Sequence, residues 1–390
     1  MPSLDRIVIV GASLAGLRAA QALREEGFTG DLTLVGAEPH LPYNRPPLSK
    51  SLLTGDDDVT LPGDGFDARW MGGRRAVALD RVARTVTLDD GADLPYDGLV
   101  IATGARPRHL PGGQGTHEGV HVLRTLDDGL ALRAALNRGP ARVVVIGAGF
   151  IGGEVASTAR SLGLDATLVE AGPLPMGGLL GETTGRWLAD HHRRNGVELI
   201  TGARVAAVAD GAVRLADGRS IPAGLVVVAT GVTPEVGWLE GSGLKVDDGV
   251  LTDAALFAQG ASDIVAAGDV ARWPHPLFGG ALVRVEHWAN ANDQGARAAR
   301  NLLRGPGDAE PHAEVPGLGT RVHGTRLQWA GFPSMADEAL VAAGDPADDK
   351  FSVAFLRDGV VVGGVAVNYP KEAIRLRKAV AAREASASPA

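Results

Sequence analysis

The sequence predicts an α/β fold in several domains, and three observations support this prediction. Two apolar strands, at residues 6–10 and 142–146, each lead into a glycine-rich turn and then a helix rich in small residues. A segment of nineteen residues recurs in the two halves, as residues 86–104 and 213–231. At 390 residues the chain also exceeds the size at which one hydrophobic core keeps growing, so we expect two or three domains.

The first turn has the pattern G-x-S-x-x-G, with a helix expected to about Glu26. The next strand, residues 32–35, ends near Glu38, which lies 22 residues after Gly16, where a ribose-binding carboxylate belongs. Such a turn lets a pyrophosphate approach the free amides at the helix start, although Ser13 replaces the middle glycine. A turn without ligand is the alternative for this segment alone. The expected ligand contacts are Gly11, Ser13, Leu14, Ala15, Gly16 and Glu38.

The second turn carries the full G-x-G-x-x-G pattern and precedes a helix expected through Ser161. Glu170 ends the strand at residues 166–169 and lies 18 residues after Gly152. A carboxylate there accepts a hydrogen bond from a ribose 2'-hydroxyl and repels a 2'-phosphate, which predicts NADH rather than NADPH. Two such turns, each with its acidic residue, favour dinucleotide binding over a ligand-free turn. The expected contacts are Gly147, Gly149, Phe150, Ile151, Gly152 and Glu170.

The recurring segment indicates that one domain has been duplicated. Its two copies align without gaps, match at nine positions, and each pass from an Asp-Gly hairpin signal into an apolar strand that ends in Ala-Thr-Gly. We therefore predict an α/β protein with two Rossmann-like, three-layer dinucleotide-binding domains plus an α+β C-terminal domain. Two dinucleotide domains in one chain are typical of a protein that passes electrons between two dinucleotides.

Composition excludes several classes of function. The chain has no cysteine, which excludes disulfides, thiolate metal sites, iron-sulfur ligation by this chain and a redox dithiol. The net charge of -8 argues against general nucleic-acid binding. No apolar run approaches the roughly 18 residues of a membrane helix, and the early strand leaves no room for a signal segment, so we expect a soluble, cytoplasmic protein. The adjacent His191 and His192 are expected at the surface, and no metal site is predicted.

Four motifs resemble those of a known family. They are Gly11 to Gly16, the run Arg45-Pro46-Pro47-Leu48-Ser49-Lys50, the segment Gly147 to Glu154, and Ile264-Val265-Ala266-Ala267-Gly268-Asp269. Together they are similar to the FAD-containing, NADH-dependent reductases of ferredoxins and rubredoxins, of the putidaredoxin reductase type, within the glutathione-reductase-like flavoproteins. The resemblance implies an FAD-binding domain at 1–107 and 234–315, an NAD-binding domain at 108–233 and a C-terminal interface domain at 316–390 with a disordered tail.

The resemblance also implies the site residues. Lys50 is expected near flavin N5 in an ion pair with Glu154, where a fixed ammonium stabilises negative charge on the reduced flavin. A surface Glu and a loop Lys without contact are the alternative. Gly231 is expected to let a strand end pass close to NAD. Further FAD contacts are implied for Arg45, Ala76, Thr103, Gly104, Arg124, Asp269, His287 and Trp288.

The chain departs from the family pattern in two places. Residues 174–179 contain no arginine, although the family commonly has one there for the adenosine end of NADH. Residues 317–319 are Gly-Leu-Gly where the family has an aromatic cluster beside the flavin, and Arg321 replaces an acidic neighbour. These departures affect the expected NADH affinity and the choice of acceptor, and Trp329 is a candidate to compensate for the missing aromatic residues.

The resemblance implies that the function is electron transfer from NADH through FAD to a small, acidic [2Fe-2S] ferredoxin that serves a cytochrome P450 or an oxygenase. Without cysteines, the flavin itself must pass the electrons on. A basic docking face is expected at Lys371, Arg375 and Lys378, or at Arg297, Arg300 and Arg304, with a solvated surface as the alternative. We expect a monomer or weak homodimer. An NADH oxidase or quinone reductase, and an NADH-sensing flavoprotein resembling apoptosis-inducing factor, remain alternatives.

The C-terminal region is expected to be an α+β domain. Short β-like runs lie at residues 352–356 and 360–367, and a helix is expected from Lys371. The tail at residues 385–390 contains small residues and proline, which predicts disorder.

Overall fold

The computed structural model describes residues 4–56, 58–61, 65, 67–110, 119–209 and 211–385. Residue contacts divide the chain into two compact units, and each consists of three separate segments. Unit 1 consists of Met1–Asn44, Thr60–Arg106 and Thr233–Pro316. Unit 2 consists of Arg45–Val59, Pro107–Val232 and Gly317–Ala390.

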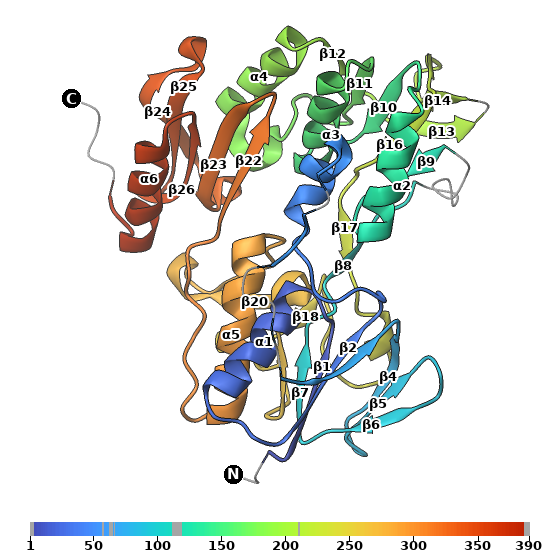
Figure 1. Ribbon diagram of the computed structural model, residues 1–390. Helices are drawn as coiled ribbons and strands as arrows, with labels where there is room; N and C mark the ends of the chain where they lie inside the picture. The colour runs from blue at the N-terminus through green and yellow to red at the C-terminus, as the bar shows by residue number, and fades with distance from the viewer. Residues whose placement is uncertain are drawn as a thin grey trace. The chain divides into compact units, whose positions relative to one another are not determined.

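The main sheet of unit 1 is parallel and has the strand order β19-β7-β1-β2-β3. Its strands are β1 (Arg6–Val10), β2 (Asp31–Gly36), β3 (Arg69–Gly72), β7 (Gly98–Ile101) and β19 (Ile264–Ala266). Residues 7–10 are all buried, because a parallel sheet is covered on both faces and needs an almost continuous apolar run. Helices α1 (Leu14–Glu25) and α5 (Trp288–Arg304) pack against each other beside this sheet (Figure 1).

Two small sheets complete unit 1. One is the antiparallel sheet of β4 (Ala76–Asp80), β5 (Thr85–Leu88) and β6 (Asp93–Pro95); the other contains β18 (Val250–Leu251), β20 (Ala271–His275) and β21 (Ala281–Val283). A core of buried aliphatic side chains with Tyr96 and Trp238 connects β1 and β7 to these strands. Strands β8 (Ala105–Pro107) and β17 (Val232–Pro234) pair with each other.

The first part of unit 2 repeats this architecture. Its parallel sheet has the order β12-β11-β10-β16-β9. The strands are β9 (Val120–His121), β10 (Val143–Ile146), β11 (Ala166–Val169), β12 (Val197–Ile200) and β16 (Leu225–Val228), and the helices are α2 (Leu126–Asn137), α3 (Phe150–Ser161) and α4 (Gly177–Arg194). A small antiparallel sheet follows, of β13 (Val205–Ala209), β14 (Ala212–Leu215) and β15 (Ser220–Pro222). The two copies of the repeat thus form β5-β6-β7 and β14-β15-β16.

The C-terminal part of unit 2 is an antiparallel sheet in the order β22-β23-β26-β25-β24, with α6 packed on β23 and β26 (Figure 1). Its elements are β22 (Gly317–Val322), β23 (Thr325–Gly331), β24 (Glu338–Asp345), β25 (Lys350–Arg357), β26 (Val360–Val367) and α6 (Pro370–Ala382). The sequence predicted β25, β26 and α6, but not the other three strands. The predicted disordered tail lies outside the described residues except for Ala385, which forms an isolated bridge with Val360.

Short 3-10 helices connect these elements. They are η1 (Pro46–Ser49), η2 (Ser51–Thr54), η4 (Gly237–Leu239), η5 (Gly268–Val270), η6 (Pro276–Phe278), η7 (Pro333–Met335) and η8 (Pro346–Asp348). Among the described residues, no helix combines the length and the apolar character that a membrane crossing needs.

Candidate functional site

The first glycine turn, in unit 1, tolerates no side chain at its two outer positions. Gly11 has a φ of +113°, and a Cβ there would lie 2.0 Å from the carbonyl oxygen of Ala102. A Cβ on Gly16 would lie 1.8 Å from the carbonyl oxygen of Gly11. The turn therefore packs tightly against the Ala-Thr-Gly end of β7, and α1 begins directly after it at Leu14 with no acidic side chain in its first turn. The amides at this helix start suit an anion.

The second glycine turn, in unit 2, has the same backbone geometry. Gly147 has a φ of +102°, and its Cβ would lie 2.4 Å from the carbonyl oxygen of Ala229, while a Cβ on Gly152 would lie 1.9 Å from that of Gly147. At Gly149, by contrast, an added Cβ would have no atom within 4 Å. Gly149 is the N-cap of α3, so this open space adjoins uncapped helix amides. Both turns fit a dinucleotide pyrophosphate.

An acidic side chain stands near each turn, after the second strand of its sheet. Glu170 follows β11 and accepts hydrogen bonds from the amides of Ala148, at 2.8 Å, and Gly172, at 2.7 Å. Glu38 follows β2 and accepts a hydrogen bond from the Tyr43 hydroxyl at 2.6 Å. Each carboxylate is thus oriented by a neighbour, in the position where an acidic residue accepts from a nucleotide ribose in this type of fold.

Lys50 and Glu154, both in unit 2, form an ion pair. The Lys50 Nζ lies 2.7 Å from the Glu154 Oε2, and the glutamate side chain is 5% exposed whereas the lysine side chain is 35% exposed. Lys50 also donates to the Pro46 carbonyl at 3.2 Å. Glu154 accepts two further hydrogen bonds, from the hydroxyls of Ser49 and Thr320. The three donors hold this buried carboxylate in one orientation, and the carboxylate in turn holds the Lys50 ammonium in one place.

In unit 1, η5 and the start of α5 meet the N-terminal end of α1. The contact is close, because a Cβ on Gly268 would lie 3.0 Å from the Ala15 Cβ. The Gly268 amide donates to Gln294 Oε1 at 2.9 Å, while the buried Gln294 Nε2 has no hydrogen-bond partner among the described residues. A buried donor of this kind fits a ligand with oxygen acceptors. Gln294 was not predicted from the sequence, although a glutamine on the buried face of an amphipathic helix is a signal that could have found it.

Three further predicted FAD residues lie in the same part of unit 1. Asp269 belongs to η5, and its carbonyl accepts from Arg284 at 3.2 Å. His287 is the N-cap of α5, and burial lowers its pKa to about 4 although Asp269 acts in the opposite direction. The indole of Trp288 donates to the Asn44 side chain at 3.0 Å. The three residues therefore gather near the α1 turn.

The remaining predicted residues make backbone contacts. In unit 2, the Arg45 guanidinium donates to the Arg124 carbonyl. In unit 1, the Thr103 hydroxyl donates to the Glu235 carbonyl at 2.7 Å. Gly104 and Gly231 have φ values of +69° and +92°, so both strand ends need glycine, and Ala76 begins β4.

Trp329 lies on the aromatic residue of the second turn. Its ring stacks on Phe150 with centroids 4.2 Å apart and planes 1° apart, and Trp329 is 5% exposed. Leu318, in the Gly-Leu-Gly segment, pairs with Trp329 across β22 and β23. Ile151, next to Phe150, is 40% exposed. The stack joins the start of α3 to the C-terminal sheet.

The surface placement expected for His191 and His192 is wrong. They are 5% and 0% exposed, because α4 packs against the turn between β22 and β23, which the sequence did not predict. His191 Nε2 lies 3.1 Å from the Val322 carbonyl, and His192 Nδ1 lies 3.1 Å from His323 Nε2. Burial lowers the pKa of His192 to about 3 and that of His323 to about 4. Both imidazoles are therefore neutral near pH 7.

Comparison with known proteins places this architecture in a family. The family model "Pyridine nucleotide-disulphide oxidoreductase" matches residues 5–295, and the model "Reductase C-terminal" matches residues 321–390. The ferredoxin--NAD(+) reductase component of the p-cumate 2,3-dioxygenase system of Pseudomonas putida is 38% identical over 390 residues, which cover 97% of this chain and 94% of that protein.

Two solved structures are similar throughout. The ferredoxin reductase for the CYP199A2 system from Rhodopseudomonas palustris has a TM-score of 0.92 and 33% identity, over 98% of this chain and 96% of that chain. The reductase in the covalent putidaredoxin reductase-putidaredoxin complex has a TM-score of 0.90 and 31% identity, over 97% of this chain and 93% of that chain. The predicted fold class and family are confirmed. This chain belongs to the pyridine nucleotide-disulphide oxidoreductase family.

Proposed function

We propose that this chain is an NADH-dependent flavoprotein reductase that transfers electrons through FAD to a small [2Fe-2S] ferredoxin. The observation that carries this proposal is the pair of glycine turns, each closed to side chains at its outer positions and each followed by a helix that has no side-chain cap at its N-terminus. The relatives named above act as ferredoxin reductases of oxygenase and P450 systems, which supports the acceptor class. We assign residues 1–107 and 234–315 to FAD, residues 108–233 to NADH, and residues 316–390 to an interface domain.

The chain's own residues would orient and stabilise the cofactors. FAD, when bound, supplies the chemistry that converts a two-electron hydride donor into single-electron transfers. The Lys50 ammonium would stabilise negative charge on the reduced flavin, and Glu154 would keep that ammonium fixed once water is excluded. No cysteine is present in the sequence, so no dithiol of this chain can relay the electrons. Glu170 would select NADH, because its carboxylate repels a 2'-phosphate.

The basic face of α6 is the better candidate for docking an acidic ferredoxin. Lys371 and Lys378 are exposed on α6, and Arg375 lies between them on the helix, where it pairs with Glu372 at 2.8 Å. Ile374, also on α6, is 60% exposed and offers an apolar contact beside the charges. Positive charge around a small apolar centre suits a transient partner of opposite charge.

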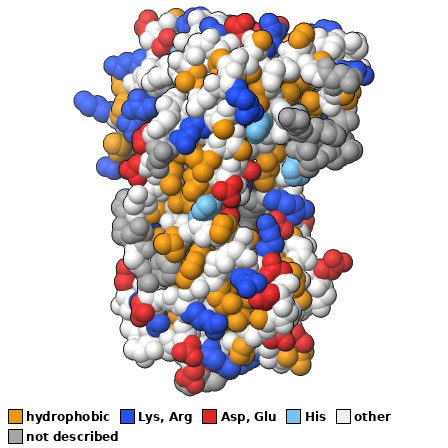
Figure 2. All heavy atoms as spheres, turned by 45° about the vertical axis from the view of Figure 1, so that its right-hand side comes forward, with side chains coloured by type: hydrophobic (Ala, Val, Ile, Leu, Met, Phe, Trp, Pro, Cys, Tyr) orange, Lys and Arg blue, Asp and Glu red, His pale blue; other side chains and the backbone are white. Residues whose placement is uncertain are grey.

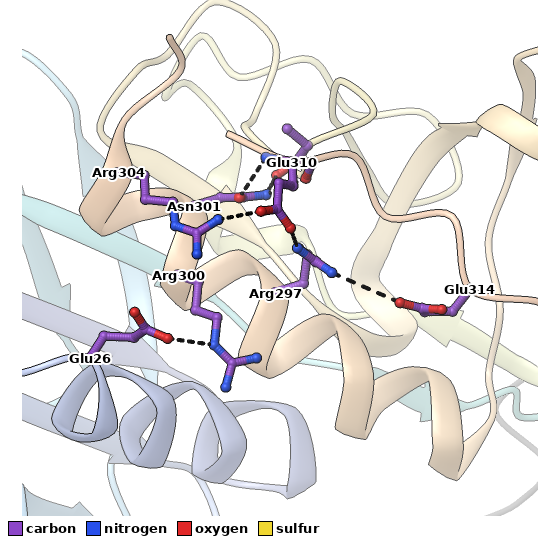
Figure 3. A network of polar contacts seen from close by, with 8 residues as sticks. Glu26, Arg297, Arg300, Asn301, Arg304, Glu310 and Glu314 are labelled. Atoms are coloured by element: carbon purple, nitrogen blue, oxygen red, sulfur yellow. Dashed lines mark hydrogen bonds and ion pairs between the residues drawn. The ribbon is translucent and has the colours of Figure 1, made fainter. Parts of the chain in front are cut away.

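The positive charges of the second basic set, on α5, are paired with acidic side chains of the same chain. Figure 3 shows Arg297 and Arg304 on either side of the Glu310 carboxylate, and Arg300 pointing to Glu26. Paired arginines present little net field to a partner. Figure 2 likewise shows lysines and arginines interspersed with acidic side chains over the visible face. The α5 set is therefore a structural network joining α5 to α1 and to the following segment.

Charge reversal on α6 tests the docking face. Lys371→Glu and Lys378→Glu should each raise the KM for ferredoxin about fivefold at low ionic strength, because each removes one attractive pair and adds a repulsive one. NADH-dependent reduction of ferricyanide, which needs no docking, should not change. Lys245→Glu, which reverses an exposed lysine of unit 1, is the matched control. Equal effects of all three substitutions would indicate a nonspecific response to net charge.

The acceptor class can be tested by comparing electron acceptors. The purified protein with FAD and NADH should support ferredoxin-dependent reduction of cytochrome c at a much higher rate than it consumes oxygen or reduces quinones. Dominant oxygen or quinone reduction would favour the oxidase or quinone reductase alternative. A long-lived reduced flavin complex with NAD and slow turnover on every acceptor would instead favour the NADH-sensing alternative.

A further inference from the structure

The Lys50–Glu154 pair has a third partner that comes from the C-terminal sheet. Both Glu154 oxygens are occupied: Oε2 by the Lys50 ammonium and the Ser49 hydroxyl, and Oε1 by the Thr320 hydroxyl. Thr320 is 4% exposed and lies in β22, opposite Leu327 of β23. The carboxylate is therefore held between the loop that carries Lys50 and a strand 166 residues further along the chain.

The strand that carries Thr320 is anchored on α3 at a second point. The His323 amide donates to the Ser157 hydroxyl at 2.7 Å, one turn of α3 beyond Glu154. The His323 ring also lies 3.1 Å from the ring of His192. Because Glu154 and Ser157 are three residues apart, they lie on the same face of α3, so β22 and the turn after it meet this face through two separate hydrogen bonds.

The backbone leading to Lys50 is fixed separately. The Thr158 hydroxyl, also on α3, donates to the Ser49 carbonyl at 3.0 Å. Thr158 thus holds the main chain next to Lys50, whereas Thr320 holds the carboxylate that faces the ammonium. Without a donor at Oε1, the buried carboxylate would have an unsatisfied oxygen and would rotate or move toward solvent.

We propose that Thr320 is a positioning residue for electron transfer, which acts through Glu154 to hold the Lys50 ammonium in place. This inference rests on the proposed role of Lys50 beside the flavin. It assigns to the C-terminal sheet a direct part in setting the charge at the flavin, in addition to any part in interfaces. The hydroxyl, rather than the size of the side chain, carries this role.

Two substitutions of Thr320 distinguish the role of its hydroxyl group from the role of its side-chain shape. Thr320→Val keeps the shape and should reduce the rate of flavin reduction by NADH about tenfold in stopped-flow mixing, while the NADH concentration for half-maximal rate changes little. It should also make the midpoint potential of the bound FAD more negative. Thr320→Ser keeps the donor and should resemble the unsubstituted protein in both measurements. Unchanged rate and potential in Thr320→Val would overturn the inference.

Two controls distinguish positioning from loss of structure. Ser157→Ala removes the hydrogen bond from the His323 amide but leaves the Thr320 hydroxyl on Glu154, so it should lower the thermal unfolding temperature without changing the flavin potential. If Thr320→Val does not retain FAD, Thr320→Ala takes its place, with the same expected changes. A potential that shifts as much in Ser157→Ala as in the Thr320 variant would mean that the turn acts only as a structural support, and the inference would fail.

Lys50→Ala distinguishes failure of this inference from failure of the proposed function. If the inference holds, Thr320→Val has no further effect on rate or potential when Lys50 is already alanine, because both act through the same ammonium. If Lys50→Ala itself changes neither quantity, the proposed role of Lys50 is wrong. If Lys50→Ala changes both but Thr320→Val changes neither, only the positioning role of Thr320 is wrong.

Discussion

The two glycine turns share one backbone geometry but differ at the residue where a phosphate would lie. Gly11 and Gly147 both have positive φ and both pack against the carbonyl of an Ala-Thr-Gly strand end. The middle position is Ser13 in the first turn and Gly149, facing open space, in the second. The positions that pack against the protein are therefore the same in both turns, and the position where a phosphate would lie differs.

The helices that follow the turns differ in what covers them. Helix α1 packs on α5 so closely that a Cβ on Gly295 would lie 2.3 Å from the Ala15 carbonyl oxygen. Helix α3, by contrast, meets two polar side chains near its start: Thr320 at Glu154, and the His192 ring at 3.5 Å from a Cβ built on Gly153. The first turn therefore lies on a rigid helix pair, and the second lies beside the groups that surround Lys50. This difference suits a resident FAD and an exchangeable NADH.

The largest effects on stability and cofactor binding are expected from alanine substitution of one glycine in each turn. Gly11→Ala should lower the free energy of unfolding by more than about 2 kcal/mol and abolish FAD retention, because positive φ and the Ala102 carbonyl both oppose a side chain. Gly149→Ala should leave stability unchanged and weaken NADH binding, since its methyl group would occupy open space where the phosphate approaches. Denaturant unfolding and NADH titration measure the two effects. Equal loss of stability in both variants would contradict the comparison.

The helix contacts provide a second matched pair. Gly295→Ala should cost about 2 kcal/mol of stability, because the backbone of α1 leaves no space for the methyl group. Gly153→Ala should cost nothing and can stabilise α3 by up to about 1 kcal/mol, because alanine favours helix and the nearest ring atoms lie at 3.5 Å. Thermal unfolding of both variants checks this contrast. A large loss in Gly153→Ala would mean that α3 is packed as tightly as α1.

The buried His192, whose ring lies against α3, predicts that the stability of the protein depends on pH. His192 has a pKa of about 3 in the folded protein, against an ordinary value of 6.5, so only the unfolded chain binds its proton between these values. Its contribution to stability is fully present above pH 6.5 and decreases as the pH falls toward 3, by up to about 1.4 kcal/mol per pH unit. His192→Leu should therefore gain stability relative to the unsubstituted protein as the pH falls from 6.5 to 5. A difference that stays constant with pH would exclude this account.

The smallest effects are expected from neutralising the two acidic residues beside the turns, Glu170 and Glu38. Glu170→Gln removes the charge but keeps an acceptor for the Ala148 and Gly172 amides, so the preference for NADH over NADPH should fall about tenfold. Glu38→Gln, the equivalent change in the first unit, should affect FAD retention and leave that preference unchanged. Steady-state rates with each nucleotide provide the measurement. A shift in preference caused by the Glu38 variant would mean that the two turns bind the opposite cofactors.

The turns and their helices could be predicted because their signals are local. The glycine spacing fixes the strand-turn-helix path within about ten residues, and the predicted α3 through Ser161 and β11 at residues 166–169 match the structure. Strands β22 and β24 were missed because their own residues, such as Gly317, Gly319 and the alanines of β24, have weak strand preference. Pairing with β23 and β25 decides their conformation.

Residues of the candidate site could be predicted only where they belong to a recognisable sequence motif. The Lys50–Glu154 contact came from the resemblance, because nothing in the spacing of two residues over a hundred positions apart predicts contact. Thr320 and Gln294 belong to no sequence motif. Their roles depend on contacts with Glu154 and Gly268, which are distant in the sequence and meet them only in the folded chain. The burial of His191 and His192 has the same cause, since their cover comes from a turn that was not foreseen.

The most direct test of the central claim is anaerobic titration of the purified protein with NADH, after its flavin content has been measured. The account predicts one FAD per chain, retained through purification or restored by reconstitution, and complete bleaching of the yellow flavin absorption by a stoichiometric amount of NADH. A colourless protein that takes up no flavin, or a bound flavin that NADH leaves oxidised, would contradict it.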